Sequence, residues 1–120
     1  RPTRPLKERF YQKRQLKETH RSMATEKFGI IIEKNPPEST LTQLGVRSWP
    51  KWELIPPSKF PWTFSTKESC YLLEGKVKVY PDGSDEAVEI EAGDLVVFPK
   101  GLSCTWDVSV TVDKHYYHSE

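Results

Sequence analysis

The sequence predicts an all-β domain, a sandwich or a barrel built from short strands. Polar and apolar residues alternate with a period of two in segments such as 76–80 (KVKVY), as they do in strands with one buried face. Glycine and proline turn signals separate these segments at regular spacing. Prolines are dense in residues 47–64, which excludes a regular helix there.

The first third of the chain contains the few helical signals. Residues 6–21 favour a short charged helix, although their apolar positions are too sparse to require burial. Residues 28–34 (FGIIIEK) are apolar and β-branched, so they predict a strand. Residues 38–44 predict one helical turn that ends at Gly45, because glycine suits the position that follows a helix.

Predicted strands then follow one another to the C-terminus. Residues 47–64 contain four prolines and three tryptophans, and they predict extended segments at a sheet edge. The Asp82-Gly83 pair is a hairpin turn signal. Further strands are expected at residues 68–73, 76–80, 87–91, 95–98 and 104–112, with residues 115–118 continuing the last of them.

The charge of the chain divides it into a basic leader, residues 1–22, and a mildly acidic body, residues 23–120. The leader has eight Lys or Arg and two Glu, a net charge of +6, whereas the body has a net charge of −5. We expect the leader to be disordered or helical, either a solvated tail or a remnant of a transit peptide. The body is expected to form one domain.

These features exclude several classes of partner. An acidic body lacks the basic surface that nucleic acid requires, and no segment approaches the ~20 apolar residues of a membrane helix. We therefore expect no nucleic-acid or membrane partner. Two cysteines without a secretory signal predict an intracellular protein, cytoplasmic or, if the leader is a transit-peptide remnant, plastidic.

Two motifs sharpen the fold prediction. In the first, six residues separate Glu68 from Gly75, and in the second, GDLVVFPKG begins at Gly93 and is followed by Cys104. Over residues 60–117 the chain resembles the cupin family. It is most similar to the small single-domain branch of ureidoglycine aminohydrolase and ethanolamine-utilisation cupins, whose plant and bacterial members are often described as RmlC-like. The resemblance implies a double-stranded β-helix, or jelly-roll, barrel after a flexible basic leader.

The same resemblance implies a metal site, which is altered here. Cupins typically hold Mn, Fe, Ni or Zn with three histidines and a carboxylate. The histidine positions hold Trp62, Phe64 and Cys104 in this chain, and Glu68 is retained. Indole and phenyl rings cannot replace imidazole, so we expect no metal cofactor. Because Glu68 and Cys70 share one strand face, an alternative is a zinc site formed by Glu68, Cys70 and Cys104.

The two cysteines allow three further interpretations. Each could pack as a small apolar residue, or Cys70 and Cys104 could form a disulfide. A reactive thiol would need a neighbouring base or cation, for which Lys114 and His115 are the candidates. His118 lies near the C-terminus and is expected to be solvated.

The substitutions predict an aromatic-lined pocket in the barrel. Motif register and strand alternation turn five side chains inward: Trp62, Phe64, Cys104, Trp106 and Val108. The expected ligand-binding residues are Trp62, Phe64, Glu68, Cys70, Cys104, Trp106 and His115. Such a lining favours a small molecule with a flat face, for example a sugar, a cyclic amide or an amine. The alternative is that the aromatic side chains fill the barrel and leave no cavity.

Glu68 also has two interpretations. A carboxyl group buried among aromatic rings has a raised pKa and can act as a general acid or base. Alternatively, Glu68 forms a structural ion pair, for which the candidates are Arg47, Lys51 and Lys114.

Three functions follow from these alternatives. The first is a cupin without metal that binds a small molecule. The second is an enzyme, such as an aminohydrolase or isomerase, that uses Glu68 with Cys104 or His115. The third is an interaction protein with a filled barrel. The resemblance also allows a homodimer, whose interface would suit Trp49 and Trp52 if they do not cover the sheet of their own chain.

Overall fold

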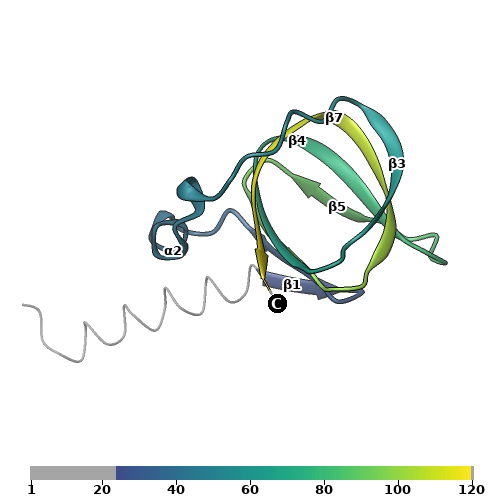
Figure 1. Ribbon diagram of the computed structural model, residues 1–120, viewed down its shortest axis with the longest axis horizontal. Helices are drawn as coiled ribbons and strands as arrows, with labels where there is room; N and C mark the ends of the chain where they lie inside the picture. Colours follow the sequence, from purple (N-terminus) through teal and green to yellow (C-terminus); the bar gives the residue numbers. More distant parts are fainter. Residues whose placement is uncertain (1–23, 120) are drawn as a thin grey trace, which may run out of the picture.

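The computed structural model describes residues 24–119, and these form a small antiparallel β-barrel (Figure 1). The predictions for the leader, residues 1–22, lie outside the described residues. The elements in chain order are β1 (Ala24–Lys27), β2 (Ile30–Lys34), α2 (Glu38–Leu44), the 3-10 turn η1 (Val46–Ser48), β3 (Ser58–Thr63), β4 (Lys67–Pro81), β5 (Val88–Glu91), β6 (Asp94–Phe98) and β7 (Ser103–Ser119). The all-β prediction is confirmed.

One seven-stranded sheet curves around the core. Its strands follow the order β1-β2-β6-β4-β7-β3, and β5 pairs with β4 off this path. Figure 1 shows the strands surrounding a central space, with α2 to one side of the barrel. The short helix was predicted correctly, since it ends at Gly45, whose φ of 68° is left-handed.

The long pairing of β4 with β7 forms the main wall of the barrel. We predicted two strands, 68–73 and 76–80, but the structure joins them into the single strand β4. The pairing with β7 continues through register shifts between Leu72 and Val77. Gly75 lies within this irregular stretch with φ of 111°. A Cβ atom there would lie 2.6 Å from the carbonyl oxygen of Thr111, so the close approach of the two strands requires glycine.

The strand predicted at residues 28–34 begins at Ile30 in the structure, as β2, and β1 lies before it. Phe28 and Gly29 form the two-residue turn between β1 and β2, with φ angles of 57° and 81°. Two successive positive φ angles are those of the tight hairpin turn that matches strand twist. The apolar run therefore begins as a turn because Gly29 allows one there.

The core of the barrel consists of aliphatic and aromatic side chains from the inward faces of the strands. Phe64 and Phe98 stack with ring centroids 4.5 Å apart, and Phe98 also contacts Trp106 at 5.8 Å. These aromatic rings fill one part of the interior.

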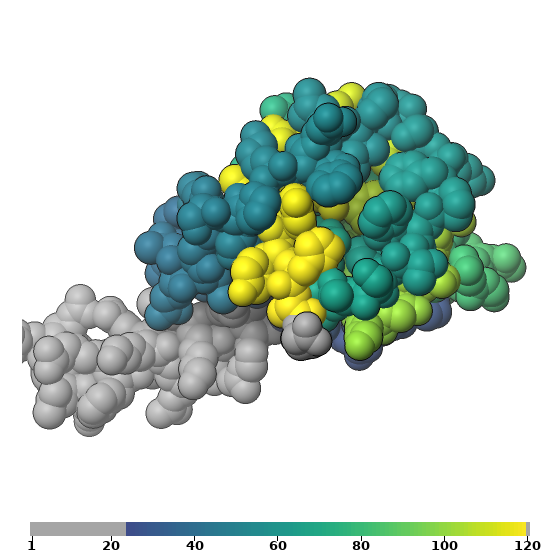
Figure 2. Space-filling view, in the orientation of Figure 1, coloured from purple at the N-terminus to yellow at the C-terminus, as the bar shows by residue number. Residues whose placement is uncertain are grey.

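A proline-rich segment, residues 51–63, runs along the edge of β7 that is not paired with β4. Single bridges join Lys51 to His115 and Ile55 to Val112, and β3 then pairs with residues 103–108. The prediction of extended edge segments is confirmed. In the space-filling view of Figure 2 this segment (teal) lies beside the end of β7 (yellow).

Candidate functional site

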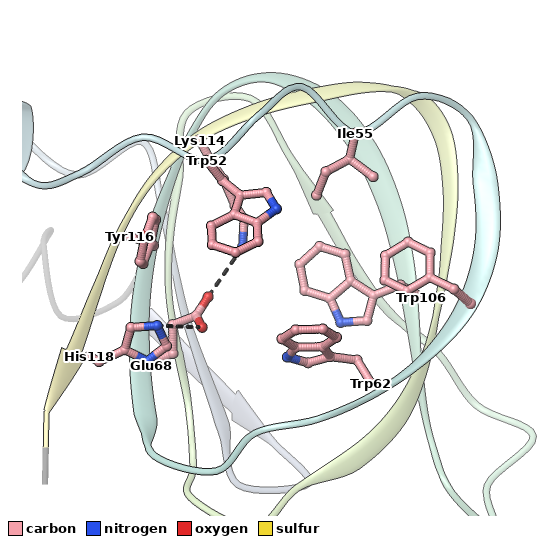
Figure 3. A pocket seen from close by; sticks show the side chains of 9 residues that line it. Trp52, Ile55, Trp62, Glu68, Trp106, Lys114, Tyr116 and His118 are labelled. Carbon is pink, nitrogen blue, oxygen red and sulfur yellow. Dashed lines mark hydrogen bonds and ion pairs between the residues drawn. The ribbon is translucent and has the colours of Figure 1, made fainter.

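A cavity of about 210 Å³ lies between the proline-rich segment, β4 and the second half of β7. Figure 3 shows the side chains around it, with Glu68 and His118 on one side and Trp62 and Trp106 on the other. The lining consists of Trp52, Ile55, Phe60, Trp62, Glu68, Trp106, Lys114, Tyr116 and His118.

The apolar wall of the cavity is mainly aromatic. Phe60 stacks on Trp106 with ring centroids 6.1 Å apart, and Trp52 meets Tyr116 edge to face at 5.5 Å. Trp62 lies in β3 opposite Cys104 and remains 45% exposed. These rings offer flat faces that a planar molecule can contact without losing hydrogen bonds.

The polar wall is centred on the buried carboxylate of Glu68. Lys114 donates a hydrogen bond to Oε2 of Glu68 at 3.2 Å, and the thiol of Cys70 donates to the same oxygen at 2.9 Å. The ammonium group also lies 3.6 Å from the Cys70 sulfur and 5.0 Å from the centroid of the Trp106 ring. A buried charge needs such partners, and Lys114 has one carboxylate, one sulfur and one π-face.

His118 lies on the other side of the Glu68 carboxylate. Its Nε2 atom is 3.6 Å from Oε1 of Glu68, while its Nδ1 atom shares a hydrogen bond of 2.8 Å with Thr66. The imidazole is about half exposed, so it forms the solvent side of the polar wall (Figure 3).

The environment keeps the ammonium charged and the thiol neutral. Burial opposes the charge of Lys114, but Cys70 and Glu68 favour it, and the pKa of Lys114 lies above its ordinary value. Burial, and also the negative charge of Glu68, raises the pKa of the Cys70 thiol far above its ordinary value despite the opposing charge of Lys114. Cys70 is therefore a hydrogen-bond donor at neutral pH and not a nucleophile.

Strand alternation explains how these groups meet. Glu68 and Cys70 lie on the inward face of β4, as predicted, and the register places them opposite His118 and Tyr116 of β7. Lys114 lies two residues before Tyr116, so it shares that face. Of the three predicted partners for Glu68, Lys114 is the one that the structure pairs with it.

The structure brings part of the predicted ligand-binding set to the cavity. Trp62, Glu68 and Trp106 line it as expected. Phe64 does not, because it lies beyond the end of β3 and is buried against Phe98. Cys70 is fully buried and contacts the site through Glu68 and Lys114.

Cys104 and His115 lie elsewhere, contrary to prediction. Cys104 is 1% exposed, and its sulfur contacts the main-chain oxygen of Trp62 at 3.6 Å. Burial raises the pKa of Cys104 to about 11, against a smaller opposing contribution from the Trp106 side chain, so the thiol stays protonated. His115 points to the outer face of β7, where it bonds to the main-chain oxygen of Trp49 at 2.9 Å. The geometry thus places neither side chain beside Glu68.

Several lining residues were missed. Continuing the alternation from Trp106 through Val108 and Val112 turns Lys114, Tyr116 and His118 inward, so the signal was present in the sequence. His118 was expected to be solvated, and it is about half exposed, but it also lines the cavity. The contributions of Trp52, Ile55 and Phe60 depend on how the proline-rich segment pairs with β7, which no local pattern specifies.

The groups present do not fit the metal centre that the cupin resemblance implies. Among residues 24–119, no three His, Cys, Asp or Glu side chains are grouped to hold an ion. Cys104 is directed to the Trp62 main chain rather than to Glu68 and Cys70. The ammonium group of Lys114, held at Glu68, would also repel a divalent cation. Both cysteines are free thiols, so the disulfide alternative is not formed.

Comparison with known families agrees with the motif positions. Residues 41–116 match the family described as EutQ-like cupin domain. The chain belongs to the EutQ-like cupin family. In this cupin, Gly75 allows two strands of the barrel to approach closely. The GDLVVFPKG segment before Cys104 begins and ends with glycines that have positive φ angles, as turns require.

Solved structures show the same fold. A DUF861 family protein from Thermotoga maritima is 44% identical, with a TM-score of 0.71 over 75% of this cupin and 99% of that chain. A protein of unknown function (DUF1255) from Acidithiobacillus ferrooxidans is 23% identical, with a TM-score of 0.51 over 53% of this cupin and 60% of that chain. The search of curated proteins found no match. Within the described part of this cupin, no helix is long and apolar enough to cross a membrane.

Proposed function

We propose that this cupin binds a small molecule in the aromatic-lined cavity and that it does so without a metal ion. The observation that carries the proposal is the cavity of about 210 Å³, in which an aromatic wall faces the Glu68–Lys114 pair. A barrel that served only as a scaffold would be expected to fill this space with side chains.

The volume limits the ligand to one ring with a few substituents. A cavity of about 150 Å³ holds benzene, so about 210 Å³ accommodates a single ring with one polar group. Trp62 and Trp106 supply faces for such a ring, and Glu68 supplies a polar anchor at the opposite wall (Figure 3). A cationic amine is less favoured than the sequence indicated, because Lys114 already neutralises the carboxylate.

The proposal is tested by titration with single-ring probes. We expect benzyl alcohol and benzamide to change the tryptophan fluorescence of the protein in a saturable manner, and Trp62→Ala to weaken binding by roughly tenfold, since stacking contributes about 0.5–1.5 kcal/mol beyond buried area. Trp49→Ala is the matched control, because Trp49 stacks on Tyr117 outside the cavity. Linear, non-saturable changes for every ring probe would contradict the proposed function.

A further inference from the structure

We propose that the Glu68–Lys114 pair selects an uncharged, planar ligand that has a carbonyl oxygen and an N–H on the same edge, as in a primary or a cyclic amide. Lys114 would donate to the carbonyl oxygen and Glu68 would accept from the N–H. The inference rests on the proposed binding function and specifies its ligand class.

The ammonium group of Lys114 has one N–H donor that makes no hydrogen bond within the described residues, since the Trp106 ring, with its centroid 5.0 Å away, attracts the charge through its π-face. A lysine ammonium carries three N–H donors. Glu68 accepts from one, at 3.2 Å, and the Cys70 sulfur lies within reach of a second, at 3.6 Å. Lys114 lines the cavity, so its remaining donor can meet a ligand atom there. Carbonyl oxygen is the natural acceptor for it, because a charged donor makes a strong hydrogen bond.

The carboxylate of Glu68 has a complementary acceptor. Oε2 is already bonded to Cys70 and Lys114, whereas the contact of Oε1 within residues 24–119 is with the His118 imidazole, at 3.6 Å. A carboxylate oxygen has two lone-pair sites and can accept a further bond. A ligand N–H directed at Oε1 would therefore complete the polar wall beside the Lys114 donor.

The charge balance of the wall favours a neutral ligand. Glu68 and Lys114 form a buried pair with no net charge, and apart from the half-exposed His118 the remaining lining is aromatic or aliphatic. An anion would meet the Glu68 carboxylate and a cation would meet the Lys114 ammonium, each within the same small volume. A ligand that is itself charged would thus bring an uncompensated charge into the cavity.

The geometry of the pair requires donor and acceptor on one edge. The ammonium nitrogen lies 3.2 Å from Oε2, and the free acceptor Oε1 belongs to the same carboxylate, so the free donor and the free acceptor can be bridged only by ligand groups that are also close together. A primary or cyclic amide presents an N–H on the same side as its carbonyl oxygen. A linear secondary amide is trans and directs its N–H away, because the cis form costs about 2.5–4 kcal/mol.

The test uses four probes that share one ring: benzamide, N-methylbenzamide, benzoate and benzylamine. We expect benzamide to bind at least about tenfold more tightly than each of the others, measured by tryptophan fluorescence and by calorimetry at pH 7.5. Equal affinity for all four probes would overturn the inference and leave the proposed function intact. No saturable binding of any probe would instead reject the proposed function.

Variants assign the selectivity to the pair. Lys114→Met should reduce benzamide affinity by about tenfold or more while affecting benzyl alcohol little. Since Lys114→Met leaves a buried carboxylate unpaired, the double variant Glu68→Leu/Lys114→Met removes both charges and leaves neither a donor nor an acceptor at these two positions. It should likewise lose the preference for benzamide over N-methylbenzamide. Lys51→Met is the matched control, because Lys51 forms an exposed ion pair with Asp113 at 3.2 Å. Retention of the full benzamide preference in the double variant would contradict the inference.

Discussion

Lys114 is buried, yet its ammonium group has suitable partners. The carboxylate of Glu68 balances its charge, the Cys70 sulfur lies near a second donor, and the centroid of the Trp106 ring lies 5.0 Å from the ammonium group. Such an arrangement stabilises the charged form but does not show that the pair stabilises the fold, because the desolvation of two ions offsets much of their attraction.

Removing one member of the pair should therefore cost more than removing both. We expect Glu68→Gln and Lys114→Met each to lower the free energy of unfolding by about 3–5 kcal/mol, and the double variant Glu68→Gln/Lys114→Met to cost less than either single change. Urea denaturation of the four proteins measures this cycle. Additive costs in the double variant would show that the two groups act independently.

The sequence predicted part of this site at the level of single residues. Glu68, Trp62 and Trp106 were placed correctly because motif register and a period of two are local properties. Phe64 and Cys104 face inward as predicted, since both lie in the core, but neither lines the cavity, because a position in a motif does not fix which part of the interior a side chain reaches.

At the scale of elements, β4 stays continuous because Gly75 allows β7 to approach it. The backbone of β4 has φ of 111° at this residue and lies against the main chain of Thr111 and Val112. Both the conformation and the space exclude a side chain, whereas at Gly83 (φ of 83°) no atom lies within 4 Å of the Cβ position.

These two glycines provide a matched pair of substitutions. Gly75→Ala should destabilise the protein by roughly 3 kcal/mol, since a strained conformation is combined with a backbone clash. Gly83→Ala should cost only about 1–2 kcal/mol, from the left-handed conformation alone. Thermal and urea unfolding measure both values. Equal costs would indicate that the approach of Thr111 is relieved by a small shift of β7.

Element positions were predicted more completely than their pairing. Alternation, turn residues and proline content located most of the strands. The turn at Phe28 and Gly29 was missed because the apolar residues around it continue the strand pattern. The bridge between Ile55 and Val112, which brings Trp52 and Ile55 to the cavity, joins residues far apart in the sequence, and no pattern within either segment specifies it.

At the scale of the whole molecule, the buried thiols make the stability of the protein fall at alkaline pH. The pKa values of Cys70 and Cys104 are raised above 9.0 in the fold, and burial is the main cause of both shifts. Unfolding allows both thiols to ionise at lower pH, so their contribution to stability is full below pH 9.0 and is lost as pH rises through the folded values. The pKa of Lys114 is also raised, which adds a loss above pH 10.5.

The urea midpoint should accordingly fall as pH increases from 8 to 11. Cys104→Ala removes one titrating thiol and keeps a small apolar side chain, so its midpoint should fall less steeply than that of the natural protein. Parallel slopes for the two proteins would show that Cys104 ionises equally in the folded and unfolded states.

The donor set of the cavity also predicts the metal content of the protein. After growth with Mn, Fe, Ni and Zn supplied, elemental analysis should find well below one metal ion per chain. Glu68→Gln and Cys104→Ser should leave that value unchanged, because the structure does not group these two side chains with a third ligand. A stoichiometric metal that is lost in both variants would restore the alternative zinc site.

The two walls of the cavity differ in how firmly they are held. Glu68, Lys114 and His118 belong to β4 and β7, which pair along most of their lengths. Phe60 and Trp62 belong to β3, which ends the sheet order of the described residues and is hydrogen-bonded to β7 alone. Displacing β3 breaks one row of hydrogen bonds, whereas displacing β4 breaks pairings with three strands. The side that carries the polar groups is thus held more firmly than β3, so we expect Phe60 and Trp62 to be the side chains that shift to fit a ligand and open its route of entry.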